Sequence, residues 1–205
     1  MGFDKDSFDL EKQFTFYASY HANRVNVAIH LVCVWPILAT AMLLLQLSSY
    51  CFLTHLPMPH ALQNLPFGLQ APLNLALVMA IIYIVSYFAM EPIAGGLGAL
   101  MVAGLYFGTW KMVSEDWYVG GYPIWQAAWV IFFLAWTFQF IGHGVFEGRA
   151  PALLDSLDQA LITGGLFVLL EIFFFFGYRQ DFYHKMMDQV RTNIEEFRES
   201  NKKGQ

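Results

Sequence analysis

Four apolar stretches of the chain have lengths close to the roughly 20 residues that a helix needs to cross the hydrocarbon core of a bilayer. They extend over about residues 25–47, 73–90, 93–113 and 124–142. A fifth apolar run, at about 161–178, carries Glu171, and we expect it either to cross or to enter the membrane and return. The pattern predicts an all-α fold: a polytopic transmembrane helical bundle with four full spans and a fifth spanning or re-entrant helix.

The composition supports this class of protein. Of 205 residues, 57% are hydrophobic and 13% are charged, whereas an ordinary soluble domain has about 25% charged residues. Lipid accepts the apolar surface that such a chain cannot bury. We expect one membrane-embedded catalytic domain, residues 1–180, and a cytosolic tail, residues 181–205, with the apolar spacing of an amphipathic helix. The net charge of −5 argues against nucleic-acid binding.

The positions of lysine and arginine predict an orientation. Lys5, Lys12 and Arg24 precede the first apolar run, and Arg149 follows the fourth. Further lysines and arginines crowd the tail, whereas the loop at 48–72 has none. Because cytoplasmic loops are enriched in these residues, we expect a cytosolic N-terminus and tail, which requires the fifth run to be re-entrant if the other four cross.

Two histidines lie near the start of the first apolar run. His21 and His30 are separated by about half a helical rotation, so a continuous helix would point them in opposite directions. Asn23 is a favourable N-cap residue, and we expect a break there that lets His21 fold back toward His30. Asn23, Asn26 and His30 then share one stripe of the following helix.

A second group of polar residues lies at the end of the fourth run. Gln139, His143 and Glu147 are spaced by four and share one helical face, and glycines flank His143. Three imidazoles with a carboxylate are sufficient ligands for a first-row metal, and open positions suit non-haem Fe(II), with zinc or manganese as competitors. The alternative is that each histidine is a hydrogen-bonded structural residue and that Gln139 bridges helices.

These two segments resemble a known family. The pattern Y-H-x-N-x-x-N-x-x-I-H at 20–30 and the block QFIGHGVFEGRAPALLD at 139–155 are similar to the 2-hydroxy fatty acid dioxygenases of phytosphingosine breakdown, small endoplasmic-reticulum membrane proteins. The resemblance covers about residues 8–180. It implies an Fe(II)-dependent α-oxidation, in which O₂ is consumed and a long-chain 2-hydroxy fatty acid becomes one carbon shorter. It also implies that His21, His30 and His143 hold the iron.

The remaining candidate residues are polar side chains near these histidines. Those expected to act in catalysis or as a further ligand are Glu147, Glu171, Asn23 and Asn26. Those expected to bind the substrate are Arg149, Arg24 and Gln139. The chain closes with Lys202-Lys203-Gly204-Gln205, which resembles the dilysine retrieval signal of endoplasmic-reticulum proteins. This agrees with a multi-pass protein of that membrane, in contact with its lipid and with a cytosolic tail.

Three other functions would make different demands on this sequence. A di-iron hydroxylase or desaturase needs adjacent histidines in H-x-x-H-H-like boxes, which this chain lacks. A haem electron-transfer protein would use His30 and His143 as axial ligands. A non-catalytic lipid-binding or scaffold protein would hold no metal and would tolerate alanine at all three histidines. None of these hypotheses specifies an oligomeric state.

Overall fold

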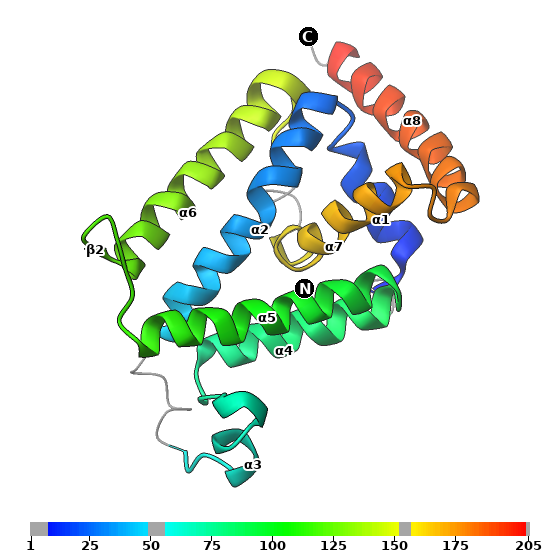
Figure 1. Cartoon of the computed structure of the whole chain (residues 1–205). Coiled ribbons are helices and arrows are strands. Elements are labelled where there is room, and N and C mark those ends of the chain that lie inside the picture. The colour runs from blue at the N-terminus through cyan, green and yellow to red at the C-terminus, as the bar shows by residue number, and fades with distance from the viewer. Residues whose placement is uncertain (1–7, 49–55, 152–156, 204–205) are drawn as a thin grey trace.

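The computed structural model describes residues 8–48, 56–151 and 157–203, which are mostly helical (Figure 1). The first half contains α1 (Leu10–Ser19), α2 (Arg24–Gln46), α3 (His60–Gln63), η3 (Pro66–Gly68), α4 (Leu75–Met90) and α5 (Ala94–Ser114). The second half contains β1 (Tyr118–Val119), β2 (Tyr122–Pro123), α6 (Ile124–Ile141), the π-helical η4 (Gly142–Glu147), α7 (Leu157–Phe175) and α8 (Gln180–Lys203). The two strands form a small antiparallel ladder that leads into α6.

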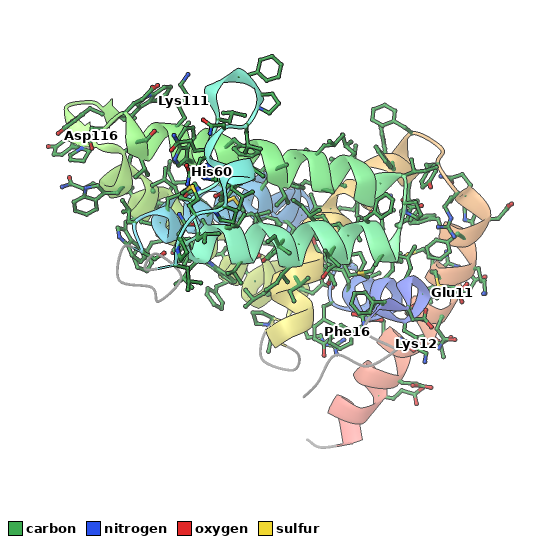
Figure 2. All side chains as sticks on the ribbon, turned by 90° about the horizontal axis from the view of Figure 1, so that it is seen from below. Glu11, Lys12, Phe16, His60, Lys111 and Asp116 are labelled. Atoms are coloured by element: carbon green, nitrogen blue, oxygen red, sulfur yellow. The ribbon has the colours of Figure 1, made fainter. Side chains whose placement is uncertain are left out.

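Two antiparallel helix pairs make up most of the bundle. Figure 1 shows α2 beside α6 and α4 beside α5, and these are the two most extensive helix contacts. Because α2 and α6 run in opposite directions, the start of α2 meets the end of α6. Figure 2 shows Lys111 and Asp116 toward one end of the molecule, and Glu11 and Lys12 toward the other. The ladder region therefore lies far from α1.

The described helices fit a membrane protein with three or four candidate spans, and the predicted number of full crossings stays a prediction. Three helices are long and apolar enough to cross: α2, α5 and the segment Ile124–Glu147. The predicted second span is α4, which has only 16 residues and is shorter than a straight crossing requires. It begins where Asn74 Oδ1 accepts a hydrogen bond from Leu77 N, and Pro92 follows its end.

The fifth apolar run forms α7 and ends at a sharp bend. Gly177 has a φ of +91°, and the helices on either side of the break meet at 117°. Counting this bent pair as one span gives four candidate spans instead of three. The geometry agrees with a re-entrant segment or with a broken span, the same two alternatives that Glu171 suggests in the sequence.

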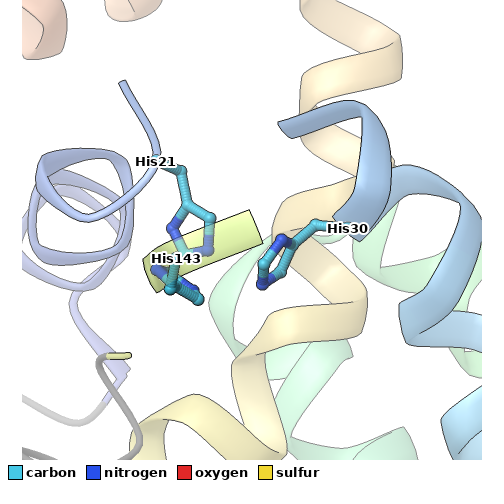
Figure 3. A group of neighbouring side chains, drawn as sticks. All are labelled: His21, His30 and His143. Atoms are coloured by element: carbon cyan, nitrogen blue, oxygen red, sulfur yellow. The ribbon is translucent and has the colours of Figure 1, made fainter. Parts of the chain in front are cut away.

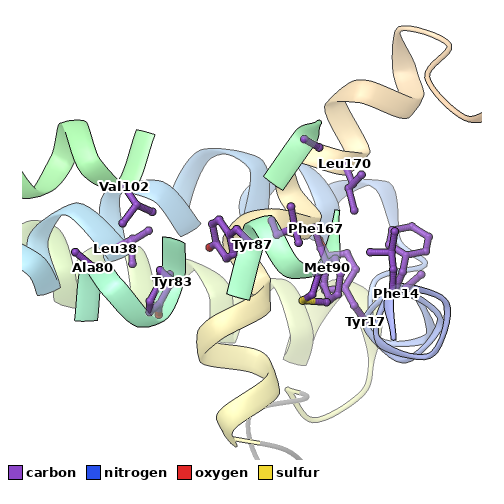
Figure 4. Packing of buried hydrophobic residues seen from close by; sticks show 14 of the residues in the cluster. Phe14, Tyr17, Leu38, Ala80, Tyr83, Tyr87, Met90, Val102, Phe167 and Leu170 are labelled. Carbon is purple, nitrogen blue, oxygen red and sulfur yellow. The ribbon is translucent and has the colours of Figure 1, made fainter. Parts of the chain in front are cut away.

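Close approach of helices at the centre of the bundle depends on glycine. The Tyr87 side chain of α4 is fully buried and lies against Gly98 of α5 and Gly165 of α7 (Figure 4). A Cβ atom at Gly165 would overlap the Tyr87 hydroxyl, and one at Gly98 would lie 2.7 Å from its ring. Small residues let helices pack closely in lipid, where apolar burial alone gives little driving force.

The terminal helices pack on each other and on α7. The Phe14 ring of α1 is fully buried, with its centroid 5.8 Å from that of Phe167 and 5.3 Å from that of Phe174. Met186 and Val190 of α8 are also buried, and α8 contacts α1 along its length. A boundary at residue 180 stays a prediction, as does the retrieval signal, because residues 204–205 lie outside the described ranges.

We expect Phe14→Ala to lower the free energy of unfolding by about 3–5 kcal/mol, because it leaves a cavity among packed aromatic rings. Thermal unfolding of the detergent-solubilised protein measures this. The control is Phe175→Ala, which truncates a side chain that is 84% exposed and should change stability by less than about 0.5 kcal/mol. Equal losses in both variants would contradict the packing described for α1.

Candidate metal centre

Three histidines from three separate segments converge at one end of the bundle (Figure 3). His21 follows α1, His30 lies in the second turn of α2, and His143 lies in η4. Their ring centroids are 4.3 to 4.9 Å apart, and one ring nitrogen from each lies within 4.8 Å of the others. All three are buried. The predicted convergence of the imidazoles is therefore present in the fold.

The predicted break before α2 brings His21 into this group. Asn23 has extended backbone angles (φ −81°, ψ 125°), and its Oδ1 accepts a hydrogen bond of 2.8 Å from Val25 N. The Tyr20 N–H bonds back to Tyr17 O and so closes α1. The chain thus changes direction between the end of α1 and the start of α2, and His21 lies in this connection.

Hydrogen bonds orient two of the rings. His21 Nδ1 lies 2.7 Å from Tyr17 O, and His30 Nδ1 lies 3.0 Å from Asn26 O. A carbonyl oxygen only accepts, so each Nδ1 carries the hydrogen and each Nε2 keeps a free lone pair. Bonding to a backbone carbonyl is the usual support of a metal-binding histidine.

The free ring nitrogens fit a metal ion. His21 Nε2 and His143 Nδ1 are buried and have no hydrogen-bond partner among the described residues. Leaving such groups unpaired costs about 1–3 kcal/mol each, which a bound cation would offset. Three nitrogens that each lie about 2.1 Å from one first-row metal are about 3.0–3.4 Å apart, so ring nitrogens that lie within 4.8 Å of one another would have to move together by at most about 2 Å to bind an ion.

His21 is held in the protonation state that binds metal. It lies between α1 and α2, and burial lowers its pKa well below the ordinary value, with a further contribution from His30. A histidine with a lowered pKa is neutral at pH 7 and offers a lone pair without first losing a proton.

Glu147 joins η4 to the start of α2. Its Oε1 accepts a hydrogen bond from Ala22 N (3.1 Å), and its Oε2 accepts from Asn23 N (2.9 Å) and Asn26 Nδ2 (3.1 Å). A carboxylate at this position also interacts favourably with the helix N-terminus. Among the described residues, the group with metal-ligand geometry contains no carboxylate. A role for Glu147 as a ligand stays a prediction, whereas its contacts are those of a residue that positions the site.

Asn26 and Gly142 form the closest contact between α2 and η4. Asn26 is fully buried, its Nδ2 also lies 3.3 Å from Tyr20 O, and its carbonyl accepts from His30. A Cβ atom at Gly142 would overlap Asn26 Oδ1. Glycine at this position therefore lets the backbone that carries His143 approach the backbone that carries His30.

The other predicted residues are placed differently. Gln139 is buried one turn before His143, and its Nε2 has no partner among the described residues. The Arg149 guanidinium stacks on the Tyr20 ring at 3.4 Å and donates to Ser19 O. Arg24 is exposed at the start of α2, and Glu171 lies partly buried in α7, outside the histidine group. The roles assigned to these four residues stay predictions.

Tyr17 is a candidate that sequence reasoning missed. Its ring stacks on His21 with centroids 4.0 Å apart and an interplanar angle of 20°. Its hydroxyl is buried without a partner among the described residues. Burial, together with nearby Glu171, raises its pKa, so the hydroxyl keeps its proton and can donate. The spacing of four between Tyr17 and His21 is the one sequence signal that pointed to it.

An apolar cavity of about 560 Å³ leads away from the histidines. At one end it is lined by Tyr17, Gln139 and the three histidines, and beyond them by apolar side chains of α2, α4, α6 and α7. Its volume is within the range of sites that bind small molecules. The arrangement joins a cluster of polar groups to an apolar compartment.

Comparison with known proteins gives a consistent family match. A family model described as 2-hydroxy-palmitic acid dioxygenase Mpo1-like matches residues 7–176. The 2-hydroxy-palmitic acid dioxygenase MPO1 of Saccharomyces cerevisiae is 31% identical over 170 residues, which cover 83% of this chain and 83% of that protein. No solved structure matches the chain.

We expect Gly142→Ala to destabilise the fold by about 1–3 kcal/mol, because the added methyl group would overlap Asn26. Gly144→Ala is the matched control, since a Cβ atom there meets nothing within 4 Å. Thermal unfolding of the metal-free protein distinguishes the two. The contact between α2 and η4 would be refuted if both variants unfolded at the wild-type temperature.

Proposed function

The chain belongs to the Mpo1-like family, and from this premise we propose that it is an Fe(II)-dependent dioxygenase that shortens long-chain 2-hydroxy fatty acids by one carbon. The observation that carries the proposal is the buried group of three histidines, with unpaired ring nitrogens, at the head of an apolar cavity. In the reaction the C1–C2 bond breaks, C2 is oxidised to the carboxyl carbon of the shortened acid, and the original carboxyl carbon leaves as CO₂. One O₂ is reduced, and one molecule of water forms, which balances the atoms and electrons.

Iron is favoured by the donor set. Three neutral imidazoles suit Fe(II), zinc or manganese, and only iron among them commonly supports dioxygenase chemistry at such a site. Fe(II) held by these three histidines would supply Lewis acidity toward the oxygens of a 2-hydroxy acid and the redox chemistry that activates O₂. A haem held by His30 and His143 is disfavoured, because the His21 ring lies 4.3 Å and 4.9 Å from their ring centroids and would occupy space that the macrocycle needs.

The protein's own groups bind the head of the substrate. Gln139 Nε2 and the Tyr17 hydroxyl are buried donors without partners, and both line the cavity beside the histidines. A carboxylate or hydroxyl placed there would satisfy them, and hydrogen bonds to a charged group contribute about 1.5–3 kcal/mol each. We assign these two side chains to orient the substrate's C1–C2 end, with Arg149, Arg24 and Glu171 as further candidates.

Other residues position the histidines and exclude water. Glu147, Asn23 and Asn26 tie η4 to the start of α2 through the contacts described above. The histidines are buried, and the cavity wall beyond them is apolar, so bulk water has little access to the reacting end. We place this site at the cytosolic face of the endoplasmic-reticulum membrane, on the basis of the distribution of lysine and arginine.

The test is iron content and turnover measured on one anaerobically purified sample. We expect near-stoichiometric iron and a product one carbon shorter when O₂ and a long-chain 2-hydroxy fatty acid are added. His143→Ala should lower both at least about tenfold, because a ligand is lost. His184→Ala, which alters an exposed histidine of α8, should leave both unchanged.

Each result has a distinct meaning. Iron-loaded protein that gives no shortened product would reject this substrate. Protein that binds no metal when reconstituted would return the three histidines to structural roles. A Soret band in the absorption spectrum would favour haem.

Gln139→Leu should raise KM for the 2-hydroxy acid about tenfold with iron content unchanged, because one hydrogen bond to a charged head group is lost. Steady-state kinetics and iron analysis of the same preparation test this. Gln189→Leu, on the exposed face of α8, is the control. A loss of iron in the Gln139 variant would instead assign that residue to metal binding.

A further inference from the structure

We propose that the cavity is an acyl channel of defined length, which receives the substrate's hydrocarbon chain along α2 and ends at Leu45 and Leu75, so that these residues limit chain length. The inference rests on the proposed function, because it takes the histidine end as the site of the head group. It adds a binding site for the chain, the direction in which the chain lies, and the residues that determine specificity.

One face of α2 forms the floor of the channel along its whole length. The α2 residues that line it recur at helical spacing; they are His30, Val34, Ile37, Leu38, Ala41 and Leu45. Beyond His30 every one of these side chains is apolar. A group bound at His30 therefore has a continuous hydrocarbon surface leading away from it.

Side walls come from α4 and α6. The α4 wall includes Leu75, Met79 and Tyr83, and the α6 wall includes Phe132 and Trp136. The Tyr83 hydroxyl donates to Leu161 O, which fixes α4 against the start of α7 at the channel's edge. The channel thus lies between α2 and the three helices α4, α6 and α7, each of which contacts α2.

A junction of hydrogen-bonded polar side chains lies just beyond the far end of the channel. Asn74 Nδ2 donates to Gln46 Oε1 at 2.8 Å, and Gln46 Nε2 donates to Tyr106 O at 3.0 Å. Leu75 N donates to Ser48 Oγ at 3.3 Å. These bonds tie the end of α2 to the start of α4 and to α5. Leu45 and Leu75, one residue away on each helix, are therefore held in place.

The length of the channel defines a class of substrate. His30 and Leu45 are about 15 residues apart on one helix, which at about 1.5 Å per residue separates them by about 22 Å. An extended chain advances about 1.2 Å per single bond, as in an extended polypeptide. The channel therefore accommodates about 16 to 18 carbons in an unbranched chain and excludes appreciably longer ones.

The channel also borders the lipid. Val78 and Ile82 of α4 and Phe140 of α6 line it and are exposed on the outside of the bundle. An acyl chain can therefore enter sideways from the bilayer without passing through water. This agrees with a substrate that is poorly soluble and partitions into the membrane.

The test is a substitution that fills the channel partway. Ala41 lines the channel about 11 residues from His30, so Ala41→Phe leaves room for about 13 bonds. We expect kcat/KM for a 2-hydroxy acid of about 16 carbons to fall at least about tenfold, while that for one of about 10 carbons is retained. Val32→Phe, on the exposed face of the same helix, should leave both values unchanged.

A second variant opens the channel. Leu45→Ala should shift the preferred chain length upward by about one or two carbons, opposite to the effect of Ala41→Phe. Because the two variants change the volume in opposite directions, general destabilisation cannot reproduce both shifts. Equal length profiles for wild type and for both variants would overturn the proposal.

A binding measurement separates this proposal from the proposed function. Native mass spectrometry of the full-length protein in detergent is performed with saturated fatty acids of about 8 to 20 carbons, which lack the 2-hydroxyl group. A length optimum that shortens in Ala41→Phe supports the channel even if no turnover is found. Binding that is independent of chain length, in a protein that does turn over 2-hydroxy acids, would reject the channel and leave the dioxygenase assignment intact.

Discussion

The rest of the site depends on the carboxylate of Glu147. Its three hydrogen bonds join the end of the α6–η4 segment to the connection before α2, across more than 120 residues of sequence. They satisfy backbone N–H groups at a helix start, where donors otherwise lack partners. The same bonds hold the break at Asn23 open, so that His21 lies beside His30. A single side chain thus fixes the relative position of all three imidazole-bearing segments.

A second constraint is the close approach of helix backbones, which occurs both near the histidines and at the centre of the bundle. Near the histidines, Gly142 meets Asn26, and deeper in the bundle Tyr87 lies against Gly98 and Gly165. In lipid, apolar burial does not drive helices together as it does in water, so dense packing must supply much of the association energy. The glycines make that density possible. The cavity lies beside these contacts and is lined by side chains of α2, α4, α6 and α7.

Sequence reasoning succeeded where the information lies within one segment. The apolar runs predicted the helices, and the phase difference between His21 and His30, with Asn23 as a cap, predicted the break and the convergence. The end of α4 at Met90 agrees with the predicted run, but the helix begins at Leu75, two residues later than expected, where Asn74 caps it. The crossing of α4 stays a prediction, because 16 residues are fewer than the roughly 20 that a span needs. The capping role of Glu147 escaped sequence reasoning because that role depends on contacts across more than 120 residues. The stacking of Tyr17 on His21 is local, but a spacing of four between a tyrosine and a histidine does not by itself distinguish a stack from ordinary helix neighbours.

The separation of the three histidines along the chain has a consequence for biosynthesis. His21 and His143 are about 120 residues apart, and α1, which carries Tyr17 beside His21, packs against α8 near the end of the chain. The cluster therefore cannot form before His143 has left the ribosome, and the packing of α1 is not complete until α8 follows. A chain that stops before η4 lacks the third histidine, so the group of three imidazoles is a property of the nearly complete chain and of no shorter fragment of its first half.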